Sequence, residues 1–264
     1  MSKKWIKCLI TALLLSASFA TGTWAQSQGS ANSDVAGPSR LFGAVEWYNA
    51  HTRVEPINSD VDKLDSNIWG GMVGYQFAQR QDWYFEARGM WSGGKGDKTV
   101  DDITFNVFSH PWFVEGRLGY QFGLGEGQEF GITPYVGYMY TANKSALGNL
   151  GGTANGLSTK MQQQNVNVGV LFDWMVMPQF QIGLNVEALV GVSGKLKLLQ
   201  DDTTVEEGKL KNKVNWNFEL PLTWQFSPTW DLTLVPFYNW IENKPKSDTD
   251  FSQSFDKISN SSTG

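Results

Sequence analysis

Thiols and imidazoles are scarce in this sequence. Its 264 residues contain one cysteine, Cys8, and two histidines, His51 and His110. With a single cysteine the chain has no internal disulfide framework and no thiolate metal site. Basic residues are also in the minority: the formal net charge is −5, whereas proteins that bind nucleic acid carry a basic surface. We therefore expect no metal, no cofactor and no nucleic-acid partner.

Long apolar runs are missing as well. Beyond residue 25, no apolar segment approaches the roughly 18 residues of a transmembrane helix, and the mean hydropathy is −0.30. One shorter apolar run, residues 8–20, follows three lysines and precedes small residues that end at Ala25. This pattern predicts a signal peptide over residues 1–25, cleaved on export. The run is too short for a retained anchor, and its removal takes the net charge from −5 to −8.

Aromatic residues and glycine are abundant, and their positions are regular. The chain is 14% aromatic, with 12 Trp and 28 Gly. Residues 26–40 are a polar lead-in, expected to be a flexible periplasmic segment. From Leu41 onward apolar and other residues alternate, and this predicts nine strands, at about 41–49, 68–78, 82–92, 111–122, 130–141, 164–175, 179–192, 213–226 and 229–241. Most have the length of a tilted transmembrane strand, about 9–11 residues.

The alternation points to a membrane barrel rather than to a soluble β-sandwich. In the eighth segment, for example, apolar residues occupy every second position from Val214 to Phe226. Sandwich strands are shorter, at about five or six residues, and have no reason to carry Trp and Tyr at both ends of one apolar face. Alternation over a bilayer's thickness with aromatic ends is typical of outer-membrane strands. We predict an all-β, up-and-down antiparallel transmembrane β-barrel over residues 41–241.

The connections predict an orientation. Short turns at 79–81, 176–178 and 227–229 alternate with long polar segments at 50–67, 93–110, 142–163 and 193–212. Short turns face the periplasm in such barrels, and long loops face outward. Two belts of interfacial aromatics follow: a periplasmic belt of Trp83, Tyr120, Trp174, Trp224 and Trp230, and an outer belt of Trp47, Trp91, Trp112, Trp216 and Trp240.

The odd number of predicted strands needs an explanation, because bacterial single-chain barrels have even numbers. Residues 242–264 are polar, and we predict an outer loop there, ahead of a missing final strand. An open seam would leave backbone groups unpaired in hydrocarbon. The complete protein is therefore expected to have ten, or twelve, strands. The alternative is a miscount, with a strand hidden in residues 99–108 or 26–40. The weak alternation near residues 100–108 is better explained by a hairpin extension above the membrane.

The inward-facing phase of the third and fourth strands predicts an ion-pair cluster. If Trp91 lies opposite Trp112, the same register sets Glu86 against Arg117 and Arg88 against Glu115. Opposite charges that face each other across two strands stabilise the pair by roughly 0.2–1 kcal/mol. The cluster is either a structural filling of a narrow barrel or a charged constriction in a pore.

The rest of the predicted lumen is acidic. Five inward carboxylates have no basic partner on the predicted strands: Glu46, Asp173, Glu187, Glu219 and Asp231. Unpaired buried carboxylates are costly, so either the lumen holds water or missing strands supply Arg and Lys. If the lumen is open, this acidic wall favours cations.

Segments such as GRLGYQFGL and ITPYVGYMYT resemble the porin-like or OmpA-like outer-membrane β-barrel superfamily, which implies a fold and a location but no substrate. The size and loop plan also resemble the omptin surface proteases, which carry acidic and histidine residues on outer loops. Here Asp101 and Asp102 are adjacent and the fourth loop has no histidine. No serine–histidine–acid spacing is visible either. We expect no enzyme.

Two functional classes remain open. One is a small porin-like channel or structural barrel with a polar, acidic lumen. The other is a surface-interaction barrel that binds adhesion partners or ligands through its long outer loops, since loops on a rigid scaffold often carry function. The expected partners are outer-membrane lipid and the barrel-insertion machinery, together with small solutes or extracellular ligands.

Overall fold

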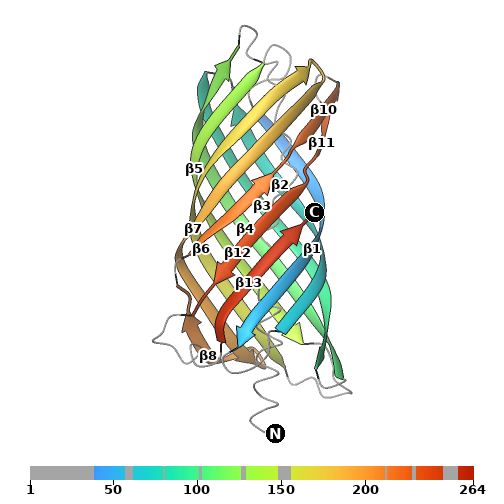
Figure 1. Ribbon diagram of the computed structural model, residues 1–264, viewed down its shortest axis with the longest axis vertical. Helices are drawn as coiled ribbons and strands as arrows, with labels where there is room; N and C mark the ends of the chain where they lie inside the picture. Colours follow the sequence, from blue (N-terminus) through green and yellow to red (C-terminus); the bar gives the residue numbers. More distant parts are fainter. Residues whose placement is uncertain are drawn as a thin grey trace.

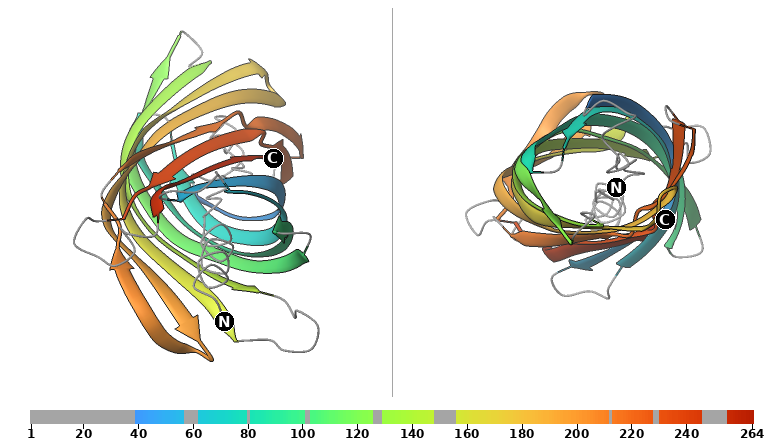
Figure 2. Two further views of the ribbon diagram at one scale, coloured as in Figure 1. Left: turned by 60° about the horizontal axis from the view of Figure 1, so that its bottom comes forward. Right: turned by 90° about the horizontal axis from the view of Figure 1, so that it is seen from above.

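The chain folds as a closed antiparallel β-barrel of ten strands (Figures 1 and 2). The computed structural model describes residues 39–56, 62–79, 81–100, 103–125, 129–147, 156–211, 213–227, 230–245 and 255–264. Within these ranges no helix is long and apolar enough to cross a membrane. The predicted signal peptide, and all of the predicted lead-in except its last two residues, lie outside the described residues.

Consecutive strands are neighbours almost throughout. The strands are β1 (Ser39–Pro56), β2 (Asp62–Ala78), β3 (Asp82–Val100), β4 (Ile103–Leu124), β5 (Phe130–Leu147), β6 (Leu157–Met177), β7 (Phe180–Gln200), β8 (Thr203–Lys209), β9 (Val214–Glu219), β10 (Leu222–Ser227), β11 (Trp230–Leu234), β12 (Phe237–Asn243) and β13 (Phe255–Thr263). β8 pairs only with the end of β7. The other twelve segments make the ten strands of the wall, because two wall strands each consist of two segments, β9 with β10 and β11 with β12.

Two of the wall strands are each interrupted at a proline. β9 and β10 both pair with β7 and are separated at Pro221, while β11 and β12 are separated at Pro236. Proline has no N–H to donate to a ladder. The two interruptions lie side by side, and the backbone N–H of Leu220 donates to the carbonyl of Pro236 at 2.9 Å. Pro134 stays within β5, opposite Val170.

The strands extend well beyond the predicted membrane segments at one end. We call this the hairpin end, where β3 turns into β4 and β7 into β8, at the bottom of Figure 1. The segment 93–110, predicted as a long outer connection with a hairpin extension near residues 100–108, is mostly a hairpin whose pairing continues to Val100 and Ile103. The other end, where β6 meets β7 through Met177 and Phe180, is the turn end. In the other extensions, polar alternation carries too little apolar signal for the sequence to reveal them.

The prediction that residues 242–264 form a loop was wrong. β12 continues to Asn243, and residues 255–263 form β13, which lies between β12 and β1. Ile258 and Ser262 of β13 are buried inside the barrel. Its outward positions are Lys257, Ser259, Ser261 and Thr263. This strand escaped the search for alternation because its outward face is polar instead of apolar.

β13 closes the barrel in its hairpin-end half. Its last residue, Thr263, lies opposite Asn49 of β1 and Tyr238 of β12. Toward the turn end, residues 39–48 of β1 pair with β2, and no other strand among the described residues pairs with them. Figure 1 shows β13 ending at mid-height, where the C label stands.

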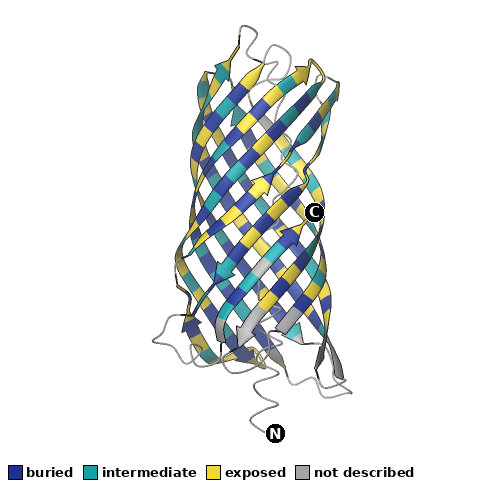
Figure 3. Ribbon diagram, viewed as in Figure 1, coloured by how far each residue is buried: buried dark blue, intermediate teal, exposed yellow. Residues whose placement is uncertain are grey.

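Burial alternates along every wall strand, as the checkered pattern of Figure 3 shows. Inward residues are buried, and apolar residues face outward. The exposed fraction is 71% for Val73, 66% for Leu234, 56% for Val136 and 51% for Val168. Eight tryptophans of the predicted belts are outward and exposed: Trp47, Trp83, Trp91, Trp112, Trp174, Trp216, Trp224 and Trp240. Tyr120 is half-buried and rests edge-on against Trp83. The side chain of Trp230 lies outside the described residues.

Candidate functional site

The lumen contains the predicted ion-pair cluster at mid-height. The structure has the register that the sequence predicted, with Trp91 opposite Trp112, Glu86 opposite Arg117 and Arg88 opposite Glu115. All four charged side chains point inward and are at most 5% exposed. The period-2 alternation puts them there, because each lies two residues from the next on the same face of β3 or β4.

Each arginine of the cluster contacts several carboxylates. Arg88 Nε donates to Glu115 Oε2 at 2.6 Å and lies 3.4 Å from Glu86 Oε1. Arg117 Nε donates to Glu115 Oε1 at 2.8 Å, and its Nη1 lies 3.7 Å from Glu86 Oε1. Asn167 of β6 also donates to Glu115. Charge-assisted bonds of this kind are the strongest hydrogen bonds available to side chains.

The same arginines also reach the opposite wall. Arg117 Nη2 donates to Glu187 Oε2 of β7 at 3.0 Å, and Arg88 Nη2 lies 4.0 Å from Glu219 Oε1 of β9. Asn217 of β9 donates to both Glu187 and Glu219, at 3.0 and 3.2 Å. Because β3 and β4 are separated from β7 and β9 by other strands on both sides, these contacts cross the lumen. We call these side chains the charged layer: Glu86, Arg88, Glu115, Arg117, Glu187, Glu219, Asn167 and Asn217.

Rings and apolar side chains lie on either side of the charged layer. Toward the turn end, Tyr135 lies under Arg117, with the guanidinium carbon 4.9 Å from the ring centroid, and Tyr84 donates to Glu86 at 2.7 Å. Toward the hairpin end, Arg88 lies over Phe113. Phe113 belongs to a buried apolar cluster with Tyr48, Ala50, Ile68, Met72, Met90, Met139, Leu189 and Phe237. The interior is thus filled at two successive levels.

The five carboxylates of the predicted acidic wall have different surroundings. The expectation that none has a basic partner was wrong for Glu187 and Glu219, which Arg117 and Arg88 approach across the lumen. Cross-strand reasoning sees only adjacent strands and misses such contacts. Asp173 accepts from Gln121 at 3.4 Å near the turn end, and Asp231 faces inward opposite Gln225. Both carboxylate oxygens of Glu46 are buried with no hydrogen-bond partner among the described residues.

Tyr84 and Tyr135 are members of the site that the sequence reasoning did not single out. Both are fully buried, and Tyr135 donates to Asn185 at 3.0 Å while its ring contacts Arg117. The sequence did carry a signal for them: each is an aromatic residue at an inward-facing position of its strand, where charged side chains are its neighbours in the lumen. Such a ring fills a narrow lumen and places its hydroxyl within the polar network.

Gly169 makes room for Tyr135, and this gives a prediction for stability. A Cβ at Gly169 would overlap the phenol ring of Tyr135. We expect Gly169→Ala to lower the free energy of unfolding by about 1–3 kcal/mol, the usual cost of overpacking. Urea titration of the protein in lipid vesicles would measure it. Gly71→Ala is the control, because its Cβ would have only one ordinary contact, 3.9 Å from the Ala44 carbonyl. Equal effects of both changes would contradict this role of Gly169.

A second group of polar residues lies on the outer surface of the barrel. His51 of β1 is directly opposite Asp65 of β2 on one side and Ser261 of β13 on the other. His51 Nδ1 and Asp65 Oδ1 are 2.7 Å apart. Ser261 is 210 residues from His51 in the sequence, so no spacing rule could have joined it to His51 and Asp65. Pairing across three strands aligns them.

The residues that resembled those of the omptins do not form such a group. His110 faces outward on β4, opposite Lys144, and its ring approaches the backbone at Gly93. Asp101 and Asp102 lie outside the described residues. No group of His, Cys, Asp and Glu in the described part of the chain is arranged to hold a metal ion.

The comparisons with known proteins bear on the fold. No family model matches the sequence, and no curated protein matches it. The transport unit of the autotransporter AIDA-I from Escherichia coli is similar in structure, with a TM-score of 0.50 at 11% identity over 97% of this chain and 95% of that one. The Pseudomonas putida toluene transporter TodX gives 0.38 at 15% identity over 94% and 73%. The attachment invasion locus protein Ail of Yersinia pestis gives 0.31 at 15% identity over 58% and 90%. This chain has the fold of outer-membrane β-barrels.

Proposed function

We propose that the protein is an integral barrel of the bacterial outer membrane that forms no open pore and acts through its outer surfaces. It would be exported with cleavage of residues 1–25 and inserted by the barrel-insertion machinery. Its hairpin end would face outward, because the strands and connections there extend far beyond the predicted membrane segments, whereas the turn end has short turns. The apolar outward face between the two rows of tryptophans supports this placement.

The observation that carries the proposal is the charged layer. Arg117 and Glu187, on opposite walls, are joined at 3.0 Å, which leaves no passage between them. The adjacent apolar cluster adds a second barrier, because a hydrophobic constriction resists wetting. A narrow barrel filled in this way is a packed core, in contrast to the water-filled channel of wide porins.

Conductance of the full chain in a planar bilayer tests the closed lumen. We expect no steady open-channel current above that of the protein-free bilayer, since ions would have to pass the charged layer and the apolar cluster. Flotation of the protein with vesicles, together with protection of the barrel from added protease, would first show that it is inserted. A stable open state of inserted wild-type protein, with or without cation preference, would refute the proposal.

A further inference from the structure

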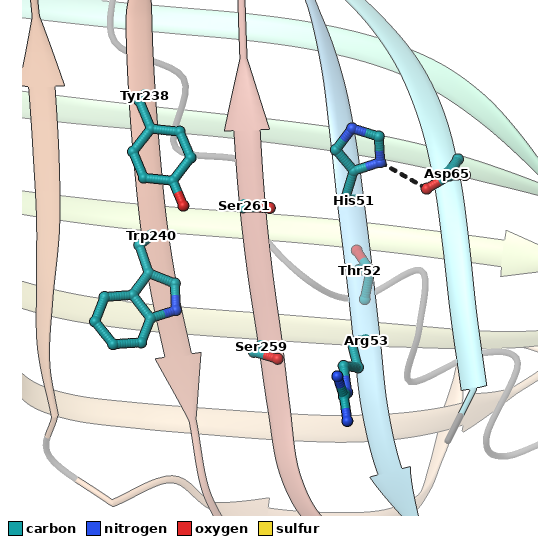
Figure 4. Close-up of a pocket in the computed structure, with 8 residues that line it drawn as sticks. All are labelled: His51, Thr52, Arg53, Asp65, Tyr238, Trp240, Ser259 and Ser261. Carbon is teal, nitrogen blue, oxygen red and sulfur yellow. Dashed lines mark hydrogen bonds and ion pairs between the residues drawn. The ribbon is translucent and has the colours of Figure 1, made fainter. Parts of the chain in front are cut away.

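Four neighbouring strands place a row of functional side chains on the outer face of the barrel. The row runs from Trp240 of β12 through Ser261 of β13 and His51 of β1 to Asp65 of β2. Figure 4 shows these side chains, with His51 between the serine and the aspartate. A serine, a histidine and a carboxylate in this order are the parts of a nucleophile, its general base and the group that orients the base.

The contact between His51 and Asp65 assigns the roles of the two imidazole nitrogens. Nδ1 of His51 lies 2.7 Å from Asp65 Oδ1. In the tautomer that donates the Nδ1 proton to this carboxylate, Nε2 carries the lone pair that a general base needs. In serine hydrolases an acid fixes the tautomer of the catalytic histidine in the same way.

Ser261 is the nucleophile that this base would serve. Directly opposite residues on antiparallel strands have Cβ atoms about 4.5–5.5 Å apart, and His51 and Ser261 are such a pair. No hydrogen bond joins their side chains in this structure, so the proposal requires the imidazole and the hydroxyl to turn toward each other. Catalytic hydrogen bonds often tighten only when substrate is bound. His110, the other histidine, has a lysine opposite it instead of a serine.

The row lies in a groove that has room for a ligand. The groove has a volume of about 330 Å³, and besides the row it is lined by Arg53, Tyr238 and Ser259. Arg53 is two residues from His51 on the same outward face, so it brings a positive charge next to the row. A guanidinium binds phosphate well. Trp240 and Tyr238 offer apolar rings to the other side of the groove.

The position of the groove along the barrel indicates what would enter it. Tryptophan belts lie at headgroup level. Trp240 of the outer belt lines the groove directly opposite Ser261, and His51 lies two outward positions beyond Trp47 on β1. The groove therefore extends outward from the headgroups of the outer leaflet, with Trp240 on its membrane side.

We propose that Ser261, His51 and Asp65 form the site of an esterase that hydrolyses acyl esters of anionic lipids in the outer leaflet. Arg53 would hold the phosphate of the lipid, and Trp240 and Tyr238 would contact its apolar part. This proposal goes beyond the closed lumen, and it rests on the proposed function only in placing the outer wall against lipid.

The reaction would proceed in two balanced steps. Ser261 Oγ attacks the ester carbonyl carbon and gives its proton to His51 Nε2. The tetrahedral intermediate then breaks the bond to the alcohol oxygen, which takes that proton and leaves as the lysolipid. Water attacks the acyl-serine, His51 accepts the proton of the water, and the fatty acid leaves as Ser261 recovers its proton.

The experiment combines covalent labelling with lipid hydrolysis, using the full chain refolded in detergent micelles. We expect a fluorophosphonate to form an adduct on Ser261, located by mass spectrometry of peptides. We also expect fatty acid release from diacyl phosphatidylglycerol or from lipopolysaccharide presented as mixed micelles, and the lipid that is cleaved identifies the source of the substrate. Ser261→Ala and His51→Ala should lower the rate by about 100-fold or more, and Asp65→Asn by about 10-fold or more.

His110→Ala is the matched control, since it removes the other outward histidine, and it should leave both labelling and hydrolysis unchanged. Far-UV circular dichroism would show that each variant is folded. An adduct on another serine, hydrolysis that survives Ser261→Ala, or no fatty acid from either lipid with folded wild-type protein would overturn the proposal. A protein that conducts ions yet labels and cleaves as expected would refute the closed lumen alone.

Discussion

Replacing Arg117 by alanine is expected to lower the free energy of unfolding by about 3–5 kcal/mol, the usual cost of breaking a buried ion pair from one side. Arg117 is 1% exposed and lies within 3.7 Å of carboxylate oxygens of Glu86, Glu115 and Glu187. Its removal leaves those carboxylates in the lumen without their main partner. It also removes the cation–π contact between the guanidinium of Arg117 and the ring of Tyr135. Urea unfolding of the protein in lipid vesicles, followed by tryptophan fluorescence, would measure the loss.

An exposed ion pair at the hairpin end gives the control. Lys144 Nζ lies 2.6 Å from Asp202 Oδ1, closer than most contacts of Arg117, but the two side chains are 49% and 78% exposed. Water screens exposed pairs, which contribute little to stability, so Lys144→Ala should have little effect. Lys144 donates to the carboxylate of Asp202 and lowers its pKa from the ordinary value, so the pair persists at more acidic pH than a free aspartate would allow. A loss of stability in Arg117→Ala no larger than in Lys144→Ala would show that the charged layer does not stabilise the barrel.

Placing an arginine at Val168 is expected to destabilise the protein in a bilayer by about 2–4 kcal/mol, the cost measured for Arg on the lipid face near the midplane. Val168 faces outward on β6 and is 51% exposed. It stands six residues from Trp174 of the periplasmic belt. In line with it across β5 is Leu118 of β4, which stands six residues from Trp112 of the outer belt. The side chain of Val168 therefore lies between the two aromatic belts. Vesicle-based urea titration of Val168→Arg against wild type would measure the cost.

Val205 offers a matched control for this change. It is 53% exposed, about the same fraction as Val168, but it belongs to β8, which pairs with the last residues of β7 at the hairpin end. Arginine there would stay in water, and Val205→Arg should change stability by no more than about 0.5 kcal/mol. Equal effects at the two valines would contradict the placement of the barrel wall in lipid.

The strands and their local register could be predicted from the sequence because alternation is a local property. The two faces of a strand have different surroundings. Between Trp83 and Trp91, every second residue faces outward, and the residues between them face the lumen. One pair of opposed tryptophans was then enough to align β3 with β4, including the pairs Glu86–Arg117 and Arg88–Glu115. The same reasoning failed for β13, whose outward serines look like those of a loop.

Only the tertiary structure decided which residues meet beyond neighbouring strands. The contact of Arg117 with Glu187 depends on the number of strands and on their tilt, which determine what lies across the lumen; no local pattern contains either quantity. The row of Ser261, His51 and Asp65 depends on where the end of the chain returns to its beginning, 210 residues apart in the case of Ser261 and His51. The sequence by itself therefore determined that this chain makes a barrel wall with an inner and an outer face. Closure of that wall, a long-range event, decided which side chains fill the inside, and it aligned Ser261, His51 and Asp65 on the outside.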